Sequence, residues 1–254
     1  MTGRLAVIGL GPGDARYVTP EASAALAAAA IVFGYAPYLD RVPVLPGQER
    51  RASDNRAELR RASEALEAAA EGGSVAVVSG GDPGVFAMAA AVCEAIESGP
   101  EAWRRVDLVI VPGVTAMLAV AASAGAPLGH DFCAMSLSDN LKPWATIERR
   151  LAAASSAGFA IALYNPVSRA RPWQLREAFA ILLRALSPET PVIFGRAAGR
   201  ADASTRIVPL KAAAAEPADM ATLVIVGSPE TRLVLRPGLP PLVYTPRSAV
   251  AVTT

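Results

Sequence analysis

The sequence contains 254 residues, of which 52% are apolar and 19% charged, and its formal net charge is +1. A chain of this length and composition can bury a substantial core, which excludes global disorder and allows one large domain or two small ones. The near-neutral charge is unfavourable for a nonspecific nucleic-acid coat or a polybasic membrane binder, so we expect neither partner. One histidine and two cysteines exclude a multi-histidine metal site and a disulfide framework, and we expect no metal site.

The N-terminal stretch MTGRLAVIGLGPGD has a short apolar run that glycines interrupt. A secretion signal would carry a longer apolar region and a small-residue cleavage site. No stretch of the chain approaches the roughly 18 consecutive apolar residues of a transmembrane helix. We therefore expect a cytoplasmic protein.

Apolar runs and alanine-rich helical stretches alternate along the first half of the chain. In chain order, the pattern predicts a strand at 5–8, a helix at 20–30, a strand at 31–33, a helix at 55–71, a strand at 74–78, a helix at 85–96, a strand at 107–111 and a helix at 116–123. Thr19 followed by Pro20 is typical of a helix start.

The second half repeats this rhythm. It predicts strands at 131–137, 159–164, 191–194 and 223–226, a short extended run at 206–209, and helices at 144–154 and 174–186, whereas the proline-rich tail from residue 236 is expected to be loose. Strands and helices that alternate, with nearly continuous apolar strands, indicate an α/β protein. We place a domain boundary after residue 113, which gives an N-terminal α/β domain (1–113) and a C-terminal α/β domain (114–254).

Three glycine-rich loops follow predicted strands in the first half: GLGPGD at 9–14, SGGDPG at 79–84 and PGVT at 112–115. Glycine lets the backbone turn sharply and approach a ligand closely, and ligands of open α/β sheets collect at the carboxyl ends of the strands. Many α/β proteins use a single loop of this kind only to form a turn, but three such loops in one small domain favour a bound small molecule.

Two common ligand classes fit these loops poorly. A phosphate-binding P-loop requires Gly-Lys-Ser/Thr, which the chain lacks. The dinucleotide fingerprint requires GxGxxG and an acidic residue about 20 positions later, but here the third glycine comes one residue early and the later region is the alanine run 27–30.

The motifs GLGPGD, SGGDPGVF (79–86) and VPGVTA (111–116) resemble those of the tetrapyrrole methyltransferases, which are S-adenosylmethionine (SAM)-dependent enzymes. GAPLGHDFCAMSLSD (125–139), LKPW (141–144), ALYNP (162–166) and DMATLVIVGS (219–228) are similar to the branch that methylates C17 of precorrin-3B in cobalamin biosynthesis. This resemblance covers residues 5–231. It implies two α/β domains with the cofactor in the cleft between them, a homodimer, a tetrapyrrole substrate, and methylation coupled to contraction of the macrocycle.

The resemblance also implies which residues bind SAM and its product S-adenosylhomocysteine (SAH). Pro12 would line the floor of the site, and Asp82 would attract the positively charged sulfonium, although an aspartate at this position is also typical of a turn or helix cap. The remaining cofactor contacts that it implies are Gly80, Gly81, Val85, Phe86, Thr115 and Ala116 in the first half, and Asn165, Arg196, Ala197, Thr222 and Leu223 in the second.

Ring contraction requires proton transfers, and His130 and Asp131 in the LGHDF segment are the candidate catalytic residues. A lone histidine can equally satisfy backbone groups, so a structural role stays open. Arginine suits the carboxylates of the substrate because its planar guanidinium can donate two parallel hydrogen bonds to one carboxylate. The candidates are Arg50, Arg51, Arg56, Lys142, Arg169 and Arg171, with Arg169 and Arg171 preferred.

Three alternatives remain open at this point. The enzyme could act on the cobalt-bearing ring of the anaerobic route. It could be another methyltransferase of the same fold, with a protein or ribosomal RNA as its substrate. It could also be a dehydrogenase or a noncatalytic binder of small molecules.

Overall fold

The computed structural model describes residues 3–54 and 57–248. The chain divides into two compact units, an N-terminal unit (Met1–Ala116) and a C-terminal unit (Met117–Thr254). This division falls three residues after the boundary that we place from the sequence. Each unit is built around its own sheet.

The N-terminal unit contains a five-stranded parallel sheet with the order β3-β2-β4-β1-β5. Its strands are β1 (Arg4–Gly9), β2 (Ile31–Tyr35), β3 (Glu49–Ser53), β4 (Ser74–Ser79) and β5 (Asp107–Val111). All but the first residue of β1 are buried, as expected for a parallel sheet covered on both faces. The charged edge strand β3 is absent from the sequence prediction, because its residues, ERRAS, lack the apolar run of a central strand.

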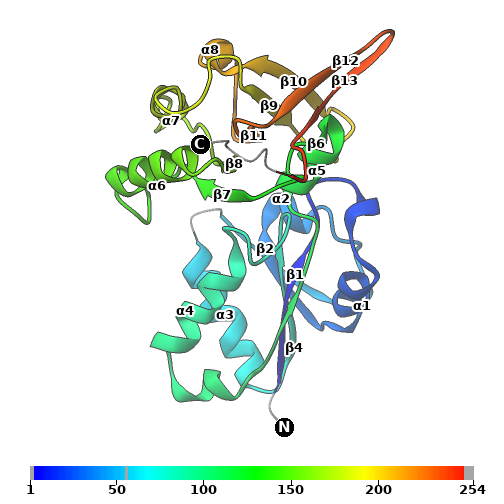
Figure 1. The fold of residues 1–254 in the computed structure, drawn as a ribbon. Helices are drawn as coiled ribbons and strands as arrows, with labels where there is room; N and C mark the ends of the chain where they lie inside the picture. Colours follow the sequence, from blue (N-terminus) through cyan, green and yellow to red (C-terminus); the bar gives the residue numbers. More distant parts are fainter. Residues whose placement is uncertain (1–2, 55–56, 249–254) are drawn as a thin grey trace. The chain divides into compact units, whose positions relative to one another are not determined.

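Helices cover both faces of this sheet (Figure 1). They are α1 (Pro20–Ala28), α2 (Ala36–Leu39), α3 (Glu58–Ala70) and α4 (Met88–Ser98), with short 3₁₀ helices at Ala15–Tyr17 and Glu101–Arg105. The face with α3 and α4 contains Phe33 and Leu66, and the face with α1 contains Ile8 and Leu26. The hydroxyl of Thr19 accepts from the Ala22 N–H at 3.0 Å and caps α1, which confirms the predicted helix start.

The C-terminal unit contains a mixed five-stranded sheet with the order β10-β9-β11-β8-β7. Its strands are β7 (Phe132–Ser136), β8 (Ala160–Tyr164), β9 (Pro191–Arg196), β10 (Ser204–Pro209) and β11 (Thr222–Val226). Strands β7 and β8 are parallel, and the other neighbours are antiparallel. The proposed function depends on the edge where β7, β8 and β9 end and β11 begins.

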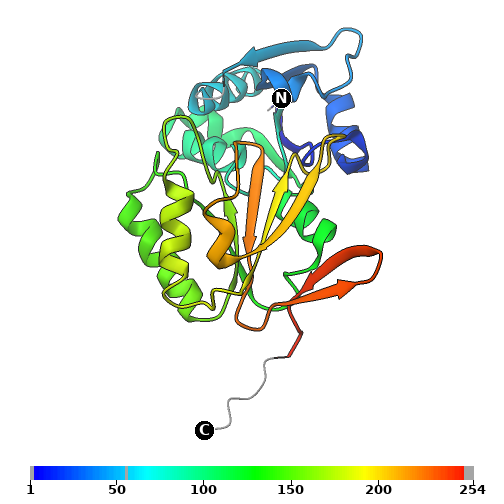
Figure 2. The same ribbon diagram turned by 90° about the horizontal axis from the view of Figure 1, so that it is seen from above.

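Two long helices, α6 (Trp144–Ser156) and α7 (Gln174–Leu182), lie side by side on one face of this sheet (Figure 2). The short helix α8 (Leu210–Ala213) joins the same core, in which Phe179 and Phe194 meet edge to face. Helix α5 (Ala116–Ala124) packs on the other face, where Gly195 leaves room for Val120: a Cβ at Gly195 would lie 2.3 Å from the Val120 side chain.

Residues 239–244 of the proline-rich tail form a strand, which corrects the sequence prediction for that part; residues 249–254 lie outside the described residues. Strands β12 (Arg232–Arg236) and β13 (Leu239–Tyr244) form a hairpin, and β13 also pairs with β6 (Gly125–Ala126) (Figure 1). Pro240 and Pro241 lie where the hairpin register shifts and where β13 has no pairing with β6. A sheet tolerates proline at such positions, because no ladder hydrogen bond is lost there.

Candidate functional site

The three glycine-rich loops meet at the carboxyl edge of the N-terminal sheet. Strand β1 lies between β4 and β5, and all three strands run in the same direction. The backbones of Gly11 and Gly81 exchange two hydrogen bonds, with N–O distances of 3.1 and 2.9 Å, which join the first loop to the second. The sheet topology therefore places residues from three distant segments in one site.

Glycine serves two different purposes in these loops. A Cβ at Gly113 would lie 2.4 Å from the carbonyl oxygen of Gly81, and one at Gly9 would lie 2.7 Å from the Gly113 nitrogen. Glycine at these two positions lets the loops pack backbone against backbone. Gly81 has a φ of +69°, and a Cβ there would be in ordinary van der Waals contact with the third loop, 3.8 Å from the Thr115 Cα and 4.0 Å from the Ala116 nitrogen. The structure thus brings Gly81, Thr115 and Ala116 together at the carboxyl edge of the sheet.

Asp82 connects two of the loops through its carboxylate. One oxygen accepts from the Gly84 N–H at 2.8 Å, and the other accepts from the Gly113 N–H at 3.0 Å. Asp82 does not cap the next helix, because α4 starts after Ala87 and has no side-chain cap. Asp82 therefore forms a turn at Gly84 rather than a helix cap, and its carboxylate lies where the second and third loops meet.

Arg41 is a residue that the sequence reasoning missed. Its guanidinium donates to the carbonyl oxygens of Leu10 and Gly11 at 2.6 and 2.9 Å. These bonds fix the backbone of the GLGPG loop next to Pro12, a predicted cofactor contact. Nothing in the sequence near Arg41 signals this role, because its partners are backbone atoms about 30 positions away along the chain. The neighbouring Gly80 packs on the Tyr38 ring, since a Cβ there would lie 2.7 Å from it.

Backbone strain is concentrated at predicted cofactor contacts. Among the residues that the structure describes, the non-glycine residues with positive φ are Phe86 (53°), Asn165 (50°) and Ala197 (50°), and all three are in the predicted cofactor set. A non-glycine residue in this region costs of order 1–3 kcal/mol, and such strain clusters at ligand-binding sites. Phe86 also explains why α4 begins at Met88 rather than at the predicted residue 85, since a left-handed residue cannot continue a helix. Val85 lies in the same turn, where its N–H donates to the Asp82 carbonyl at 3.3 Å.

The predicted cofactor residues of the second half share one edge of the C-terminal sheet. Asn165 directly follows β8, Ala197 directly follows β9, and Thr222 begins β11. The register pairs Thr222 with Arg196, and Leu223 with Gly195, so these residues are neighbours across strands β9 and β11. The Asn165 amide donates to the Ser136 hydroxyl at 3.0 Å, which ties the end of β8 to the end of β7.

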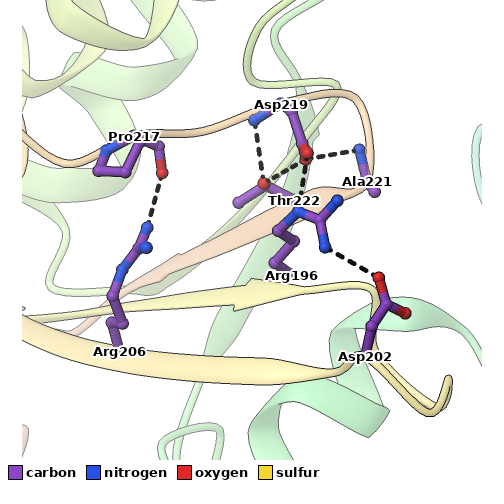
Figure 3. Close-up of polar contacts among 7 residues, drawn as sticks. All are labelled: Arg196, Asp202, Arg206, Pro217, Asp219, Ala221 and Thr222. Carbon is purple, nitrogen blue, oxygen red and sulfur yellow. Dashed lines mark hydrogen bonds and ion pairs between the residues drawn. The ribbon is translucent and has the colours of Figure 1, made fainter.

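Arg196 and Asp219 form a polar network at this edge (Figure 3). The Arg196 guanidinium donates to Asp219 at 2.8 Å and to Asp202 at 3.0 Å, and the Thr222 hydroxyl donates to Asp219 at 2.8 Å. Hydrogen bonds to Asp219 and then Asp202 raise the pKa of Arg196. Burial alone raises the pKa of Asp219, but hydrogen bonds from Thr222 and Arg196 outweigh it and lower that pKa overall. Two carboxylates hold the Arg196 guanidinium, and the neighbouring Ala197 N–H donates to the Ala221 carbonyl at 2.9 Å.

His130 and Asp131 lie away from this edge. His130 and Asp131 precede β7, whereas Asn165 follows the adjacent parallel strand β8. The two residues and Asn165 therefore lie at opposite ends of the strands, a length of roughly 16 Å at ~3.3 Å per residue. The imidazole Nδ1 lies 3.6 Å from the Asp131 carboxylate, and the Asp131 side chain is 78% exposed. Within the C-terminal unit, the structure does not bring these two residues together with the predicted cofactor contacts.

The predicted carboxylate-binding cations have mixed environments. Arg50 donates to the Leu39 carbonyl, and Arg51 pairs with Glu49 at 2.7 Å. Arg171 pairs with Asp139 at 3.2 Å and also donates to Asn140, so it joins two loops of its own chain. Lys142 and Arg169 have no ion pair within the described parts of the chain, and Arg56 lies outside the described residues.

Within residues 3–54 and 57–248, no group of three or more His, Cys, Asp or Glu side chains could hold a metal ion. No helix in these same ranges has both the length and the apolar character needed to cross a membrane.

Comparison with known proteins identifies relatives along nearly the whole chain. Residues 4–214 match the family of tetrapyrrole (corrin/porphyrin) methylases. A precorrin-3B C(17)-methyltransferase from Sinorhizobium sp. is 66% identical, and the alignment covers 97% of this chain and 97% of that protein. A probable cobalt-factor III C(17)-methyltransferase from Salmonella typhimurium is 42% identical over 89% of this chain and 93% of that protein.

Solved structures agree with this comparison. The crystal structure of the methyltransferase CobJ superposes with a TM-score of 0.91 at 50% identity, and it covers 96% of this chain and 100% of that one. A uroporphyrin-III C-methyltransferase from Thermus thermophilus, crystallised with S-adenosylhomocysteine, has a TM-score of 0.66 at 23% identity over 89% of this chain and 92% of that one. The second likeness establishes the shared fold alone.

Proposed function

The chain belongs to the tetrapyrrole methylase family and is a methyltransferase, and from that premise we propose that it methylates C17 of precorrin-3B and contracts the macrocycle to give precorrin-4. The single observation that carries this proposal is the 66% identity to the Sinorhizobium enzyme over 97% of both chains. Two of the segments that resemble the C17-methylating branch are residues 125–139 and 162–166. They contribute to β6, β7, β8 and the loops at the ends of these strands.

We propose SAM as the methyl donor. The N-terminal residues that would hold it are Pro12, Gly80, Gly81, Asp82, Val85, Phe86, Thr115 and Ala116, and those of the C-terminal unit are Asn165, Arg196, Ala197, Thr222 and Leu223. The contact of Gly81 with the Thr115–Ala116 backbone and the strained backbones at Phe86, Asn165 and Ala197 support this assignment. When bound, SAM supplies an electrophilic methyl group.

The chain's own contribution is mainly positioning. An electron-rich pyrrole-type carbon needs little activation, so holding the acceptor carbon in line supplies much of the acceleration. The glycine loops support this role, because Asp82 and Arg41 fix their backbones through hydrogen bonds of 2.6–3.0 Å. The carboxylate of Asp82 also favours a cationic ligand bound at these loops.

The metal state of the substrate is the main alternative. The Salmonella relative is named for cobalt-factor III, and the chain is 42% identical to it against 66% for the Sinorhizobium relative. The higher identity favours the metal-free ring. We further propose a homodimer, as the family resemblance implies, which sedimentation analysis of the purified protein tests directly.

The function is tested by turnover with methyl-labelled SAM and metal-free precorrin-3B, followed by mass spectrometry and absorbance. The expected result is one added label together with a changed chromophore. Transfer to the cobalt-bearing ring alone would establish the alternative substrate. Binding of SAH without transfer to either ring would overturn the C17 assignment.

A further inference from the structure

Two loops leave the C-terminal sheet side by side. Residues 137–143 connect β7 to α6, and residues 165–173 connect β8 to α7. Because β7 and β8 are adjacent and parallel, both loops emerge at the edge that carries Asn165 and Thr222. We call these two segments together the β7–β8 platform.

Arg171 fastens the two loops of the platform to each other. Its guanidinium, largely buried, donates to Asp139 at 3.2 Å and to Asn140, both in the other loop. Its backbone exchanges two hydrogen bonds with Ser168, at 3.2 and 3.0 Å. Burial tends to raise the pKa of Asp139, but its polar contacts, among them the hydrogen bond from Arg171, lower it overall. The positive charge of Arg171 is therefore already balanced within the platform.

The helix ends that border the platform are also in contact. Trp144 and Trp173 meet edge to face, with ring centroids 4.8 Å apart, at the starts of α6 and α7. This contact and the Arg171 bonds give the loops a defined arrangement, so the side chains that they expose have fixed relative positions.

The platform carries exposed apolar side chains in the same loops as two cations that form no ion pair within the described ranges. Leu141 is 95% exposed and Trp173 is 41% exposed, so both offer apolar surface to a ligand. Lys142 and Arg169 form no ion pair within the described ranges, and burial and the nearby Arg150 lower the pKa of Lys142. A flat apolar molecule with carboxylates at its rim would satisfy both features.

We propose that the β7–β8 platform binds the tetrapyrrole, with Leu141 and Trp173 against the ring, Lys142 and Arg169 on its carboxylates, and Arg171 as a positioning residue. This inference rests on the proposed function. Its location follows from chemistry, since the acceptor carbon must lie close to the donated methyl group. Asn165, a proposed cofactor contact, is the first residue of the second loop, so a macrocycle on the platform adjoins the proposed cofactor position.

The test uses the full-length enzyme and steady-state kinetics with the tetrapyrrole substrate. The double variant K142Q/R169Q removes both cations and keeps similar side-chain size. The expected result is a rise of about tenfold or more in KM for the tetrapyrrole, the loss expected for charge-assisted hydrogen bonds. The Kd for SAH should stay within about twofold. R184Q, which removes an exposed arginine in the turn after α7, is the matched control.

Three further readouts separate substrate binding from a structural role. The KM of the wild type should rise with ionic strength, and that of K142Q/R169Q should rise less. K142R/R169K should recover most of the affinity because it keeps both charges. R171M should raise KM even though Arg171 does not touch the substrate, and adding D139N to R171M should have little further effect, because both changes break the same contact.

The experiment distinguishes failure of the platform proposal from failure of the proposed function. If the wild type turns over and K142Q/R169Q has the same KM as R184Q, the platform proposal is overturned. The methyltransferase assignment stays intact in that case. Absence of turnover by the wild type on either ring would overturn the proposed function and the platform together.

Discussion

The isosteric change D82N tests the arrangement of the glycine loops most sharply. Each carboxylate oxygen of Asp82 accepts one backbone N–H, from Gly84 at 2.8 Å and from Gly113 at 3.0 Å. Asparagine keeps one acceptor and places an NH₂ group where the other oxygen stood, so one donor faces another donor. The change therefore breaks one of the two loop contacts without altering the volume of the side chain.

The magnitude follows from the type of bond. A hydrogen bond to a charged group contributes about 1.5–3 kcal/mol, and partial exposure of Asp82 places the loss at the low end, near 1.5 kcal/mol. For a chain of this length, 1 kcal/mol lowers Tm by roughly 2–4 °C, so we expect Tm to fall by about 3–6 °C. If the loops must be ordered to bind the cofactor, SAH affinity should fall by about tenfold.

Isothermal titration with SAH and thermal unfolding, measured on the same samples, provide the assay. D107N is the control, because Asp107 is exposed and its oxygen lies 3.8 Å from Arg4. Loss of SAH affinity at unchanged Tm would show that Asp82 acts only on the ligand. Unchanged values of both quantities would refute the reasoning about the loops.

Three other changes give independent tests. R41M should weaken SAH binding several-fold by freeing the carbonyls of the GLGPG loop, and R41K should restore part of it; equal affinity in R41M and wild type would contradict the role of Arg41. The pKa of Asp219 is lowered in the folded state, so the ionised carboxylate stabilises the fold above about pH 4 and this effect is lost as the pH falls below that value. The difference in free energy of unfolding between wild type and D219N, measured in urea, should therefore shrink at low pH. A difference that stays constant with pH would contradict this role of Asp219. H130A should leave kcat within about threefold because His130 lies at the far end of β7 from Asn165, whereas a fall of 10²-fold or more would establish it as a proton-transfer group.

The sheets could be read from the sequence because their signals are local. Apolar runs that end in glycine mark β1 and β4, and the Thr19-Pro20 pair marks the start of α1. The edge strand β3 and the hairpin strand β13 were missed, because charged residues in the first and prolines in the second hide the usual pattern. Their strand structure depends on neighbours that are distant in sequence.

The residues of the predicted site divide in the same way, into those with a local sequence signal and those whose role depends on distant residues. Glycine at 9 and 113 permits close backbone packing, and the sheet topology then explains why the three loops meet. The left-handed backbones of Phe86 and Ala197 could not be predicted from residue type, since phenylalanine and alanine rarely adopt them. Arg41 and Arg171 were also beyond sequence reasoning in their observed roles, because each bonds groups about 30 positions away.

The position of the transferred methyl group is the most direct test of the central claim. The purified enzyme is incubated with SAM that carries a ¹³C-labelled methyl group and with metal-free precorrin-3B, and the product is examined by ¹³C NMR. We expect a single labelled methyl on C17 of a contracted ring. Label at any other carbon, or a C17-methylated ring that has not contracted, would contradict it.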